Sequence, residues 1–132
     1  MKRIHVAVAI IVNTEQEILI AKRHQHLHQG GKWEFPGGKV ENKESVSQAL
    51  IRELKEEVNL DVHATTSFME ISHDYPDKHV LLGIHLVKDF QGNAEGIEGQ
   101  QIKWIPSSEL KNYDFPKANQ PIIDKFLELI AN

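Results

Sequence analysis

Three glutamates stand close together in the stretch RELKEE, residues 52–57. In a helix, Glu53 and Glu57 are i, i+4 neighbours and Glu56 lies three residues from Glu53, so their carboxylates gather on one side. Like charges at this spacing destabilise a helix, and a chain that had only to fold would gain nothing from them. A divalent cation would neutralise the repulsion, and hard oxygen donors favour Mg²⁺ or Mn²⁺.

The helix that positions these acids is predicted over residues 46–58, where Ser45 can cap the first turn and Gln48 can complete a capping box. Glu53 and Glu57 fall at the margin of its apolar stripe. The stripe consists of Val46, Leu50, Leu54 and Val58, and the opposite, solvated side carries Gln48, Arg52 and Lys55. An ordinary charged surface with an Arg52–Glu56 pair is the alternative, but it does not explain two half-buried acids side by side.

The loop before this helix adds to the metal interpretation. Gly37 and Gly38 let the backbone approach a ligand closely, so a carbonyl oxygen there can serve as another hard ligand. Glu44 stands just before the helix and can join the same acidic pocket. Because Mg²⁺ held by acidic residues usually keeps positions for water and substrate phosphates, the segment indicates half of a phosphate-binding site.

From Gly38 to Leu60 the sequence resembles the Nudix box, G-x5-E-x7-R-E-U-x-E-E-x-G-U, in which U is an aliphatic residue. Every fixed position matches except the last glycine, where this chain has Asn59. Asparagine is the second choice for a left-handed residue at a helix end, so the departure is expected to cost little. The likeness covers nearly the whole chain and is to the MutT branch of the family. The stretches that carry it are AVAIIVN, WEFPGGK, YPDKH, EGQQIKW and DFPKANQP.

The resemblance implies both a fold and an activity. Members of this branch have an α/β fold, with a mixed β-sheet sandwiched between α-helices. They hydrolyse nucleoside triphosphates to the monophosphate and pyrophosphate, prefer 8-oxo-dGTP, and thereby remove mutagenic nucleotides from the pool. Their cofactor is Mg²⁺, for which Mn²⁺ can substitute, and the attacking water is activated by metal and a carboxylate.

The resemblance also implies roles for individual residues. Metal ligands are expected at the Gly37 carbonyl and at the carboxylates of Glu53, Glu56, Glu57 and Glu98. Glu44 and Arg52 would support those carboxylates, and Glu53 or Glu98 would be the catalytic base. The residues expected around the nucleotide are Arg23, His28, Glu34, Phe35, Pro36, Gly37, Gly38, Lys78 and Asn119.

Position 78 is a departure, because MutT has arginine there and lysine lacks the planar guanidinium fork. Two other positions have simpler interpretations when the resemblance is set aside. Glu98 would be a solvated side chain in a polar loop, and Asn119 would be the N-cap of the last helix.

The histidines of HQHLH and the aromatic residues near the glycine loop also have a simpler interpretation than a role in binding a metal or a base. The segment HQHLH presents His24, His26 and His28 at strand spacing, but no cysteine or nearby carboxylate completes a zinc site, so a polar loop is favoured. Trp33 and Phe35 are more often core residues than platforms for a base.

The remaining elements follow from hydrophobic patterning. Residues 4–12 are nearly continuous in apolar residues, which is typical of a central strand buried on both faces. A turn at 13–16 leads to a second strand over 17–23, and residues 24–38 are predicted to be a loop with the extended piece WEFP. Further strands are predicted over 66–73, 79–89 and 101–106, with a short turn at SSEL and an amphipathic helix over 119–131.

Composition bounds the classes of protein. The chain has 132 residues, enough for a single domain over 1–132, and its net charge of -4 argues against binding a nucleic-acid polymer. It has no cysteine, which excludes a disulfide framework and fits a reducing cytoplasm. The apolar run near the N-terminus lacks a cleavage site and is interpreted as a strand, not a signal peptide. No stretch is long enough to cross a membrane, and a monomer is expected.

Two alternatives remain open at this stage. The first is another Nudix diphosphatase, which would act on ADP-ribose or a dinucleoside polyphosphate. The second is a catalytically silent module that binds nucleotides. The intact set of Glu44, Arg52, Glu53, Glu56 and Glu57 argues against the second, because a binding module need not keep acids that activate water.

Overall fold

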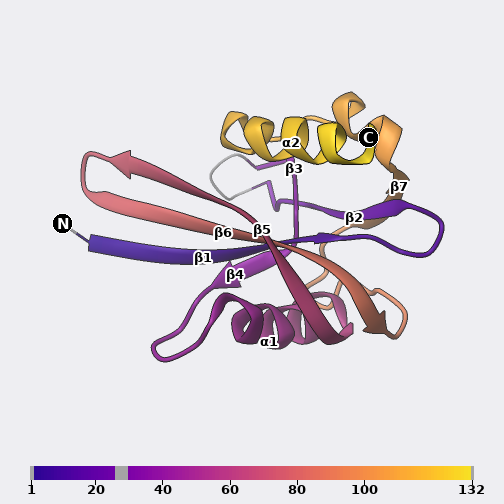
Figure 1. Ribbon diagram of the computed structural model, residues 1–132, viewed down its shortest axis with the longest axis horizontal. Helices are drawn as coiled ribbons and strands as arrows, with labels where there is room; N and C mark the ends of the chain where they lie inside the picture. Colours follow the sequence, from indigo (N-terminus) through magenta and orange to yellow (C-terminus); the bar gives the residue numbers. More distant parts are fainter. Residues whose placement is uncertain (1, 26–29, 132) are drawn as a thin grey trace.

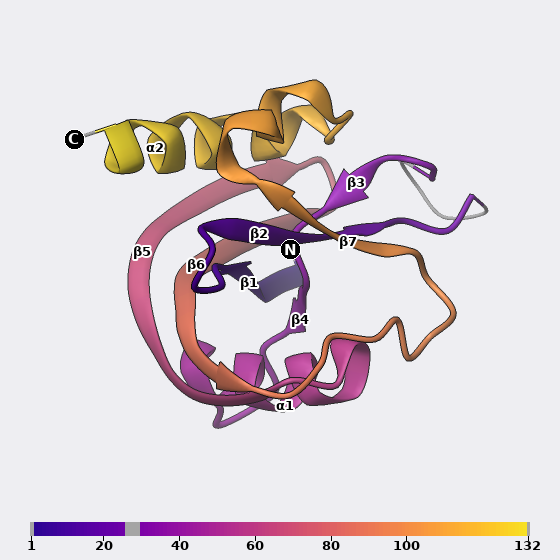
Figure 2. The same ribbon diagram turned by 90° about the vertical axis from the view of Figure 1, so that its right-hand side faces the viewer.

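The computed structural model describes residues 2–25 and 30–131. Its strands form two sheets, one of four strands in the order β4-β1-β6-β5 and one of three in the order β3-β2-β7. Helix α1 lies on one side of the strands and α2 on the other (Figures 1 and 2). The strands are β1 (Lys2–Ile11), β2 (Glu17–Lys22), β3 (Trp33–Glu34), β4 (Gly37–Lys39), β5 (Asp61–Tyr75), β6 (Lys78–Gln91) and β7 (Ile102–Pro106), and the helices are α1 (Val46–Val58) and α2 (Gln120–Ala131).

The larger sheet is mixed, because β1 runs parallel to β6 and antiparallel to β4. The predicted α/β class with a mixed sheet between helices is therefore confirmed, with the strands divided between two sheets. The chain passes from one sheet to the other at a tight turn, where the Asn13 side-chain oxygen accepts hydrogen bonds from the backbone of Glu15 and Glu17. After this turn, β2 leaves β1 and pairs with β3 and β7.

The second half of β1, residues 7–11, is buried on both faces, which explains its continuous apolar sequence. Ala7, Ala9 and Ile11 belong to the core beneath α1, whereas Val8 and Ile10 belong to the core beneath α2. The small alanines leave room for the helix to approach the sheet closely. Helix α2 completes its side of the core with the buried residues Ile122, Ile123 and Phe126.

Helix α1 has the predicted bounds and the predicted ends. Ser45 Oγ accepts a hydrogen bond from the Gln48 backbone at 3.0 Å, and Gln48 Oε1 accepts one from the Ser45 backbone at 2.8 Å. At the other end, Asn59 adopts the left-handed conformation with φ 60° and ψ 38°. The asparagine thus fills the backbone role that a glycine has in the Nudix pattern.

Several element bounds differ from those predicted. Strands β5 and β6 form a longer hairpin than 66–73 and 79–89, because backbone pairing continues through polar residues that hydrophobic patterning ignores. Strand β4 was not predicted, since its glycines have low strand propensity. Before α2 lie two 3₁₀ helices, Ser107–Asn112 and Lys117–Asn119. The first contains the predicted SSEL turn, and the second delays the start of α2 to Gln120.

Within the described residues, no helix is long and apolar enough to span a lipid bilayer.

Candidate active site

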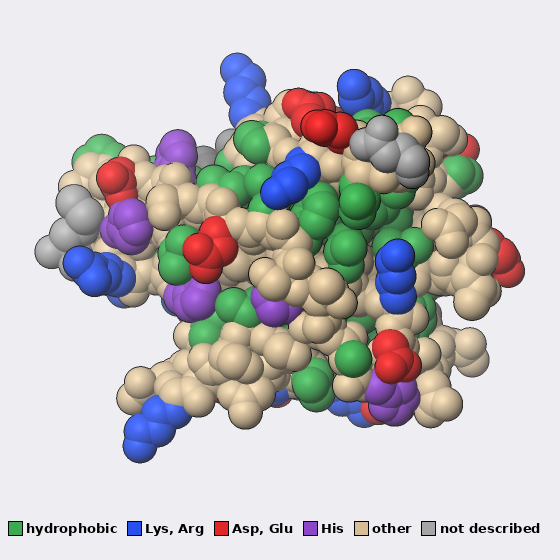
Figure 3. Space-filling model, viewed as in Figure 1, with side chains coloured by type: hydrophobic (Ala, Val, Ile, Leu, Met, Phe, Trp, Pro, Cys, Tyr) green, Lys and Arg blue, Asp and Glu red, His purple; other side chains and the backbone are tan. Residues whose placement is uncertain are grey.

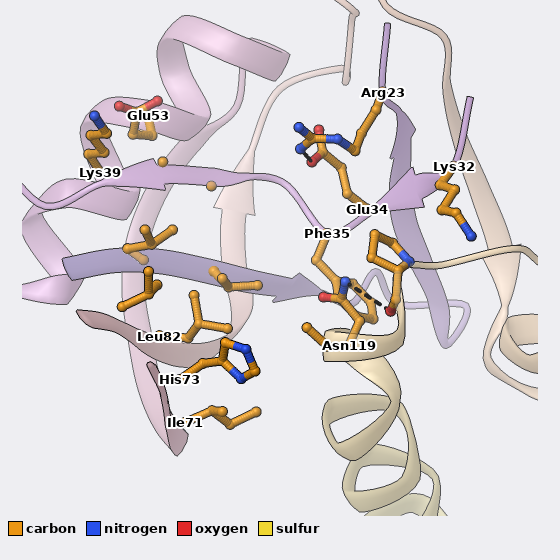
Figure 4. A pocket seen from close by; sticks show the side chains of 18 of the residues that line it. Arg23, Lys32, Glu34, Phe35, Lys39, Glu53, Ile71, His73, Leu82 and Asn119 are labelled. Carbon is orange, nitrogen blue, oxygen red and sulfur yellow. Dashed lines mark hydrogen bonds and ion pairs between the residues drawn. The ribbon is translucent and has the colours of Figure 1, made fainter. Parts of the chain in front are cut away.

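A pocket of about 1120 Å³ lies between the strands, α1 and the segment that precedes α2. Helix α1 and β4 contribute acidic and glycine residues at one end (Figure 4). The second 3₁₀ helix contributes Asn119, and the β5–β6 hairpin forms a further wall. The pocket is at the large end of the range for small-molecule sites and is big enough for a nucleotide.

Arg52 is the centre of the hydrogen bonds at the acidic end. Its Nε and Nη2 donate to the two oxygens of Glu44, each at 2.9 Å, and its Nη1 donates to Glu53 Oε1 at 2.8 Å. Its Nη2 also donates to the Lys39 carbonyl at 3.1 Å. This one side chain therefore joins α1, the loop before it and β4.

The helical-wheel prediction for Arg52 is corrected by these contacts. Its side chain is 29% exposed and turns towards the acids, whereas the prediction placed it on the solvated side. The predicted pair with Glu56 is longer, at 3.7 Å. Hydrogen bonds from Arg52 and from the Glu41 backbone hold the Glu44 pKa at about 2. The carboxylates of Glu44 and Glu53 in turn raise the Arg52 pKa.

The two glycines of β4 bring the strand against its neighbours. A Cβ on Gly38 would collide with the Glu53 carboxylate, and one on Gly37 would collide with the Ala7 carbonyl of β1. A larger residue at either position would push β4 away from β1 or from α1. The glycines therefore allow the close approach that places a backbone segment directly beside the carboxylate of Glu53.

Glu57 lies where several carboxylates meet. Burial, followed by the charges of Glu34 and Glu98, raises its pKa to about 8; Glu53 adds to this, and a backbone hydrogen bond from Gly37 opposes it. These acids come from α1, β3 and the loop after β6, so the fold collects them from distant parts of the chain. Such crowding disfavours ionisation unless a cation is bound.

The donor chemistry at this end fits Mg²⁺ or Mn²⁺, which prefer carboxylate and carbonyl oxygens. Glu53 is 21% exposed and lines the pocket, whereas Glu56 is 62% exposed and is not among the lining residues. Across residues 2–25 and 30–131, no three acidic or histidine side chains converge at metal-ligand distance in this arrangement. The residues thus fit a divalent cation by chemistry and neighbourhood.

The nucleotide residues proposed from the resemblance are distributed as follows. Arg23 and Glu34 both line the pocket and are joined by a hydrogen bond of 2.6 Å. Phe35 also lines it but is only 5% exposed, because its ring packs on Phe115 with centroids 5.0 Å apart. Pro36 is buried, and its carbonyl accepts a hydrogen bond from Ala9 at 2.9 Å.

Asn119 lines the pocket, and its Nδ2 donates to the Pro116 carbonyl at 3.5 Å. The default interpretation of Asn119 as the N-cap of the last helix is wrong, since it lies within a 3₁₀ helix and donates backwards along the chain. Lys78 lies at the hairpin tip, over the Tyr75 ring, and is not among the pocket-lining residues.

The predictions for HQHLH fall largely outside the described residues, which exclude His26 and His28. The structure adds pocket residues that the sequence did not single out. Lys39 lies beside Glu53 (Figure 4), and Lys32, Lys117 and the hairpin residues Ile71, His73, Tyr75, Val80 and Leu82 also line the pocket. Period-two alternation along β5 and β6 would have suggested that the hairpin residues share a face, but not that this face borders the acids.

Comparison with known proteins agrees with this arrangement. The model of the NUDIX domain family matches residues 7–125. The 8-oxo-dGTP diphosphatase of Escherichia coli K12 is 40% identical over 129 residues, which cover 98% of this chain and all of that protein.

Two other proteins are similar over nearly the full length. The CTP pyrophosphohydrolase of Escherichia coli K12 is 38% identical over 133 residues, covering 99% of this chain and 96% of that protein. A structure from work on MutT of Aliivibrio salmonicida and Vibrio cholerae superposes with a TM-score of 0.84 at 44% identity, covering 94% of this chain and 96% of the other.

The ion pair between Glu44 and Arg52 leads to a prediction about acid stability. Because folding lowers the Glu44 pKa from 4.5 to about 2, the pair stabilises the protein above pH 4.5, and this contribution is lost as the pH falls towards 2. We expect Glu44→Gln to lower the urea midpoint of unfolding near neutral pH, with the difference from wild type shrinking between about pH 5 and 3.

The matched control is Glu41→Gln, because Glu41 is exposed and lies 3.9 Å from Arg52. Its midpoint should follow that of the wild type at every pH. A deficit in Glu44→Gln that does not change with pH would show that Glu44 acts through side-chain shape and not through charge.

Proposed function

The chain belongs to the Nudix family, and we propose that it is a Mg²⁺-dependent enzyme that hydrolyses 8-oxo-dGTP to 8-oxo-dGMP and pyrophosphate. One observation carries the proposal: a single pocket contains Glu53 and Glu57 of the Nudix box together with the Asn119 amide. The first group suits a metal-bound triphosphate, and the second suits a base edge. The full-length similarity to an 8-oxo-dGTP diphosphatase supports the same activity.

At the acidic end, the Gly37 carbonyl, Glu53, Glu56, Glu57 and Glu98 would hold the metal. When bound, Mg²⁺ neutralises the phosphates, activates water and stabilises the leaving group. The side chains of the protein orient the groups that take part in the reaction. Arg52 fixes one oxygen of Glu53 at 2.8 Å, which orients its carboxylate for metal binding or for accepting the proton of the attacking water. Glu98 is the other possible base.

At the nucleoside end, Asn119 can distinguish the oxidised base. Guanine presents acceptors at both N7 and O6, whereas 8-oxoguanine carries a hydrogen on N7. The asparagine amide has one acceptor oxygen and one donor nitrogen, so it can accept from N7–H and donate to O6. Towards unmodified guanine the amide oxygen would face a lone pair, which leaves a polar group unpaired.

The similarity to a CTP pyrophosphohydrolase favours a second candidate function, the hydrolysis of CTP. Both reactions would use the same acidic end of the pocket. Selectivity between 8-oxo-dGTP and CTP must therefore come from the residues that contact the base. A pyrimidine is smaller than a purine and lacks the N7 edge that Asn119 is proposed to read.

We also propose that the chain acts as one domain and as a monomer in the cytoplasm, with a nucleoside triphosphate as its partner and without a nucleic-acid polymer or a membrane. Light scattering of the active protein would test the monomer.

A substrate panel tests the proposed reaction directly. Purified protein with Mg²⁺ should convert 8-oxo-dGTP to monophosphate and pyrophosphate with a much higher kcat/KM than dGTP, CTP, ADP-ribose or a dinucleoside polyphosphate. EDTA should abolish turnover, Mg²⁺ or Mn²⁺ should restore it, and either metal should raise Tm by binding the folded state. Full activity without metal would refute the metal role, and a preference for CTP would favour the second candidate.

Glu53→Gln separates chemistry from folding, because it keeps the side-chain shape and removes the charge. We expect kcat to fall by about two orders of magnitude or more, the scale for losing a general base or a key metal ligand. The metal-free protein should remain about as stable as wild type, since the lost contact with Arg52 is offset by weaker repulsion of Glu57. Glu109→Gln, at an exposed position in the first 3₁₀ helix, is the control. Near-normal turnover of Glu53→Gln would leave Glu53 as ordinary surface charge.

Asn119→Ala tests base recognition. Calorimetry should show that the variant loses much more affinity for 8-oxo-dGMP than for dGMP, by a difference of about 1–3 kcal/mol, because it removes the amide that pairs with N7–H. Asn93→Ala, at an exposed loop position, should change neither affinity. Equal losses for both nucleotides would leave the base specificity unassigned.

A further inference from the structure

Along β5, the wall of the pocket changes from apolar to polar side chains. The side chains on the α2 side of this strand run Met69, Ile71, His73, and the first two pack against the core that α2 completes. Figure 1 shows the β5–β6 hairpin projecting beyond the helix, and Figure 3 shows histidines over this part of the surface. His73 is thus the residue at which an apolar stripe becomes polar, where the strand leaves the core and borders the pocket.

The His73 ring lines the pocket from β5, on the wall across from Asn119 (Figure 4). It is exposed and makes an edge contact with the Tyr75 ring, with centroids 4.6 Å apart. Neither ring nitrogen has a hydrogen-bond partner among the described residues. Two other histidines of the hairpin are engaged, since His79 pairs with Asp74 and His85 contacts Thr65 at 2.8 Å. His73 therefore offers unused hydrogen-bonding capacity to a ligand.

The side chains beside His73 indicate which part of a ligand its ring can contact. Its cross-strand partner is Val80, and beside them lie Ile71 and Leu82, which also line the pocket. These aliphatic side chains suit the flat face of a nucleobase but cannot hydrogen-bond to its edge. An imidazole among them supplies one acceptor and one donor when neutral.

A purine whose N7 and O6 face Asn119 turns its opposite edge, with N3 and the exocyclic 2-amino group, towards the other wall. We propose that His73 is a specificity-determining residue, whose unprotonated ring nitrogen accepts a hydrogen bond from the 2-amino group of the bound guanine. This contact rests on the proposed function and extends it. It selects guanine over hypoxanthine, whose purine ring lacks that amino group. The simpler alternative is a polar residue on an exposed edge strand, which would have no effect on base preference.

The test compares 8-oxo-dGTP with 8-oxo-dITP, which differ by the 2-amino group. Wild-type protein should favour 8-oxo-dGTP in kcat/KM by about three- to tenfold, the scale of one neutral hydrogen bond. His73→Phe keeps an aromatic ring and removes its nitrogens, so it should bring that ratio close to one, mainly by raising KM for 8-oxo-dGTP. His63→Phe is the matched control, because His63 is exposed on the same strand and does not line the pocket.

The outcomes separate the two proposals. Absence of 8-oxo-dGTP turnover in wild-type protein refutes the proposed function. Turnover with equal kcat/KM for the two substrates, or with a ratio that survives in His73→Phe, refutes the His73 contact alone. Should the variant fold poorly, NMR of wild-type protein gives a second measurement. The His73 ring signals should shift more with 8-oxo-dGMP than with 8-oxo-dIMP, and equal shifts would overturn the contact.

Discussion

The acidic end of the pocket depends on the fork of hydrogen bonds from Arg52. Its guanidinium grips Glu44 with two nitrogens and Glu53 with a third, while also reaching the backbone of β4. Three segments are thereby held together at the point where negative charges accumulate. A lysine has no planar fork and cannot bond all these groups at once. The geometry of the carboxylates that face the pocket therefore follows from the geometry of one cation.

The hydrogen bonds of Arg52 can join these segments only because α1 packs closely on the sheet. Ala7 and Ala9 present small side chains beneath the helix, and Gly38 leaves space for the Glu53 carboxylate. The capping box at one end and the left-handed Asn59 at the other fix where the helix begins and ends. Packing thus sets the height of the helix above the strands, and the caps set its length. Together they decide which side chains of α1 reach the pocket.

The two ends of the pocket have different chemistries because different elements line them. Helix α1 and β4 bring carboxylates and backbone, which suit a metal and phosphates. The segment before α2 and the β5–β6 hairpin bring an amide, aliphatic side chains and His73, which suit a base. The raised pKa of Glu57 reflects this layout, because acids from α1, β3 and a distant loop share a partly buried space. A cation is the natural complement of that crowding.

The sequence alone determined the family, the α/β class, the bounds and caps of α1, and the glutamates of the Nudix box, because these depend on local spacing and on side-chain types a few residues apart. It did not determine that Arg52 turns away from solvent, that Asn119 lies in a 3₁₀ helix, or that β4 is a strand. It also did not indicate that His73 borders the same pocket as Asn119. Those features arise from pairing and packing between segments far apart in the chain. Local patterns carry no information about which of two faces a neighbouring segment will cover, so tertiary structure alone decided them.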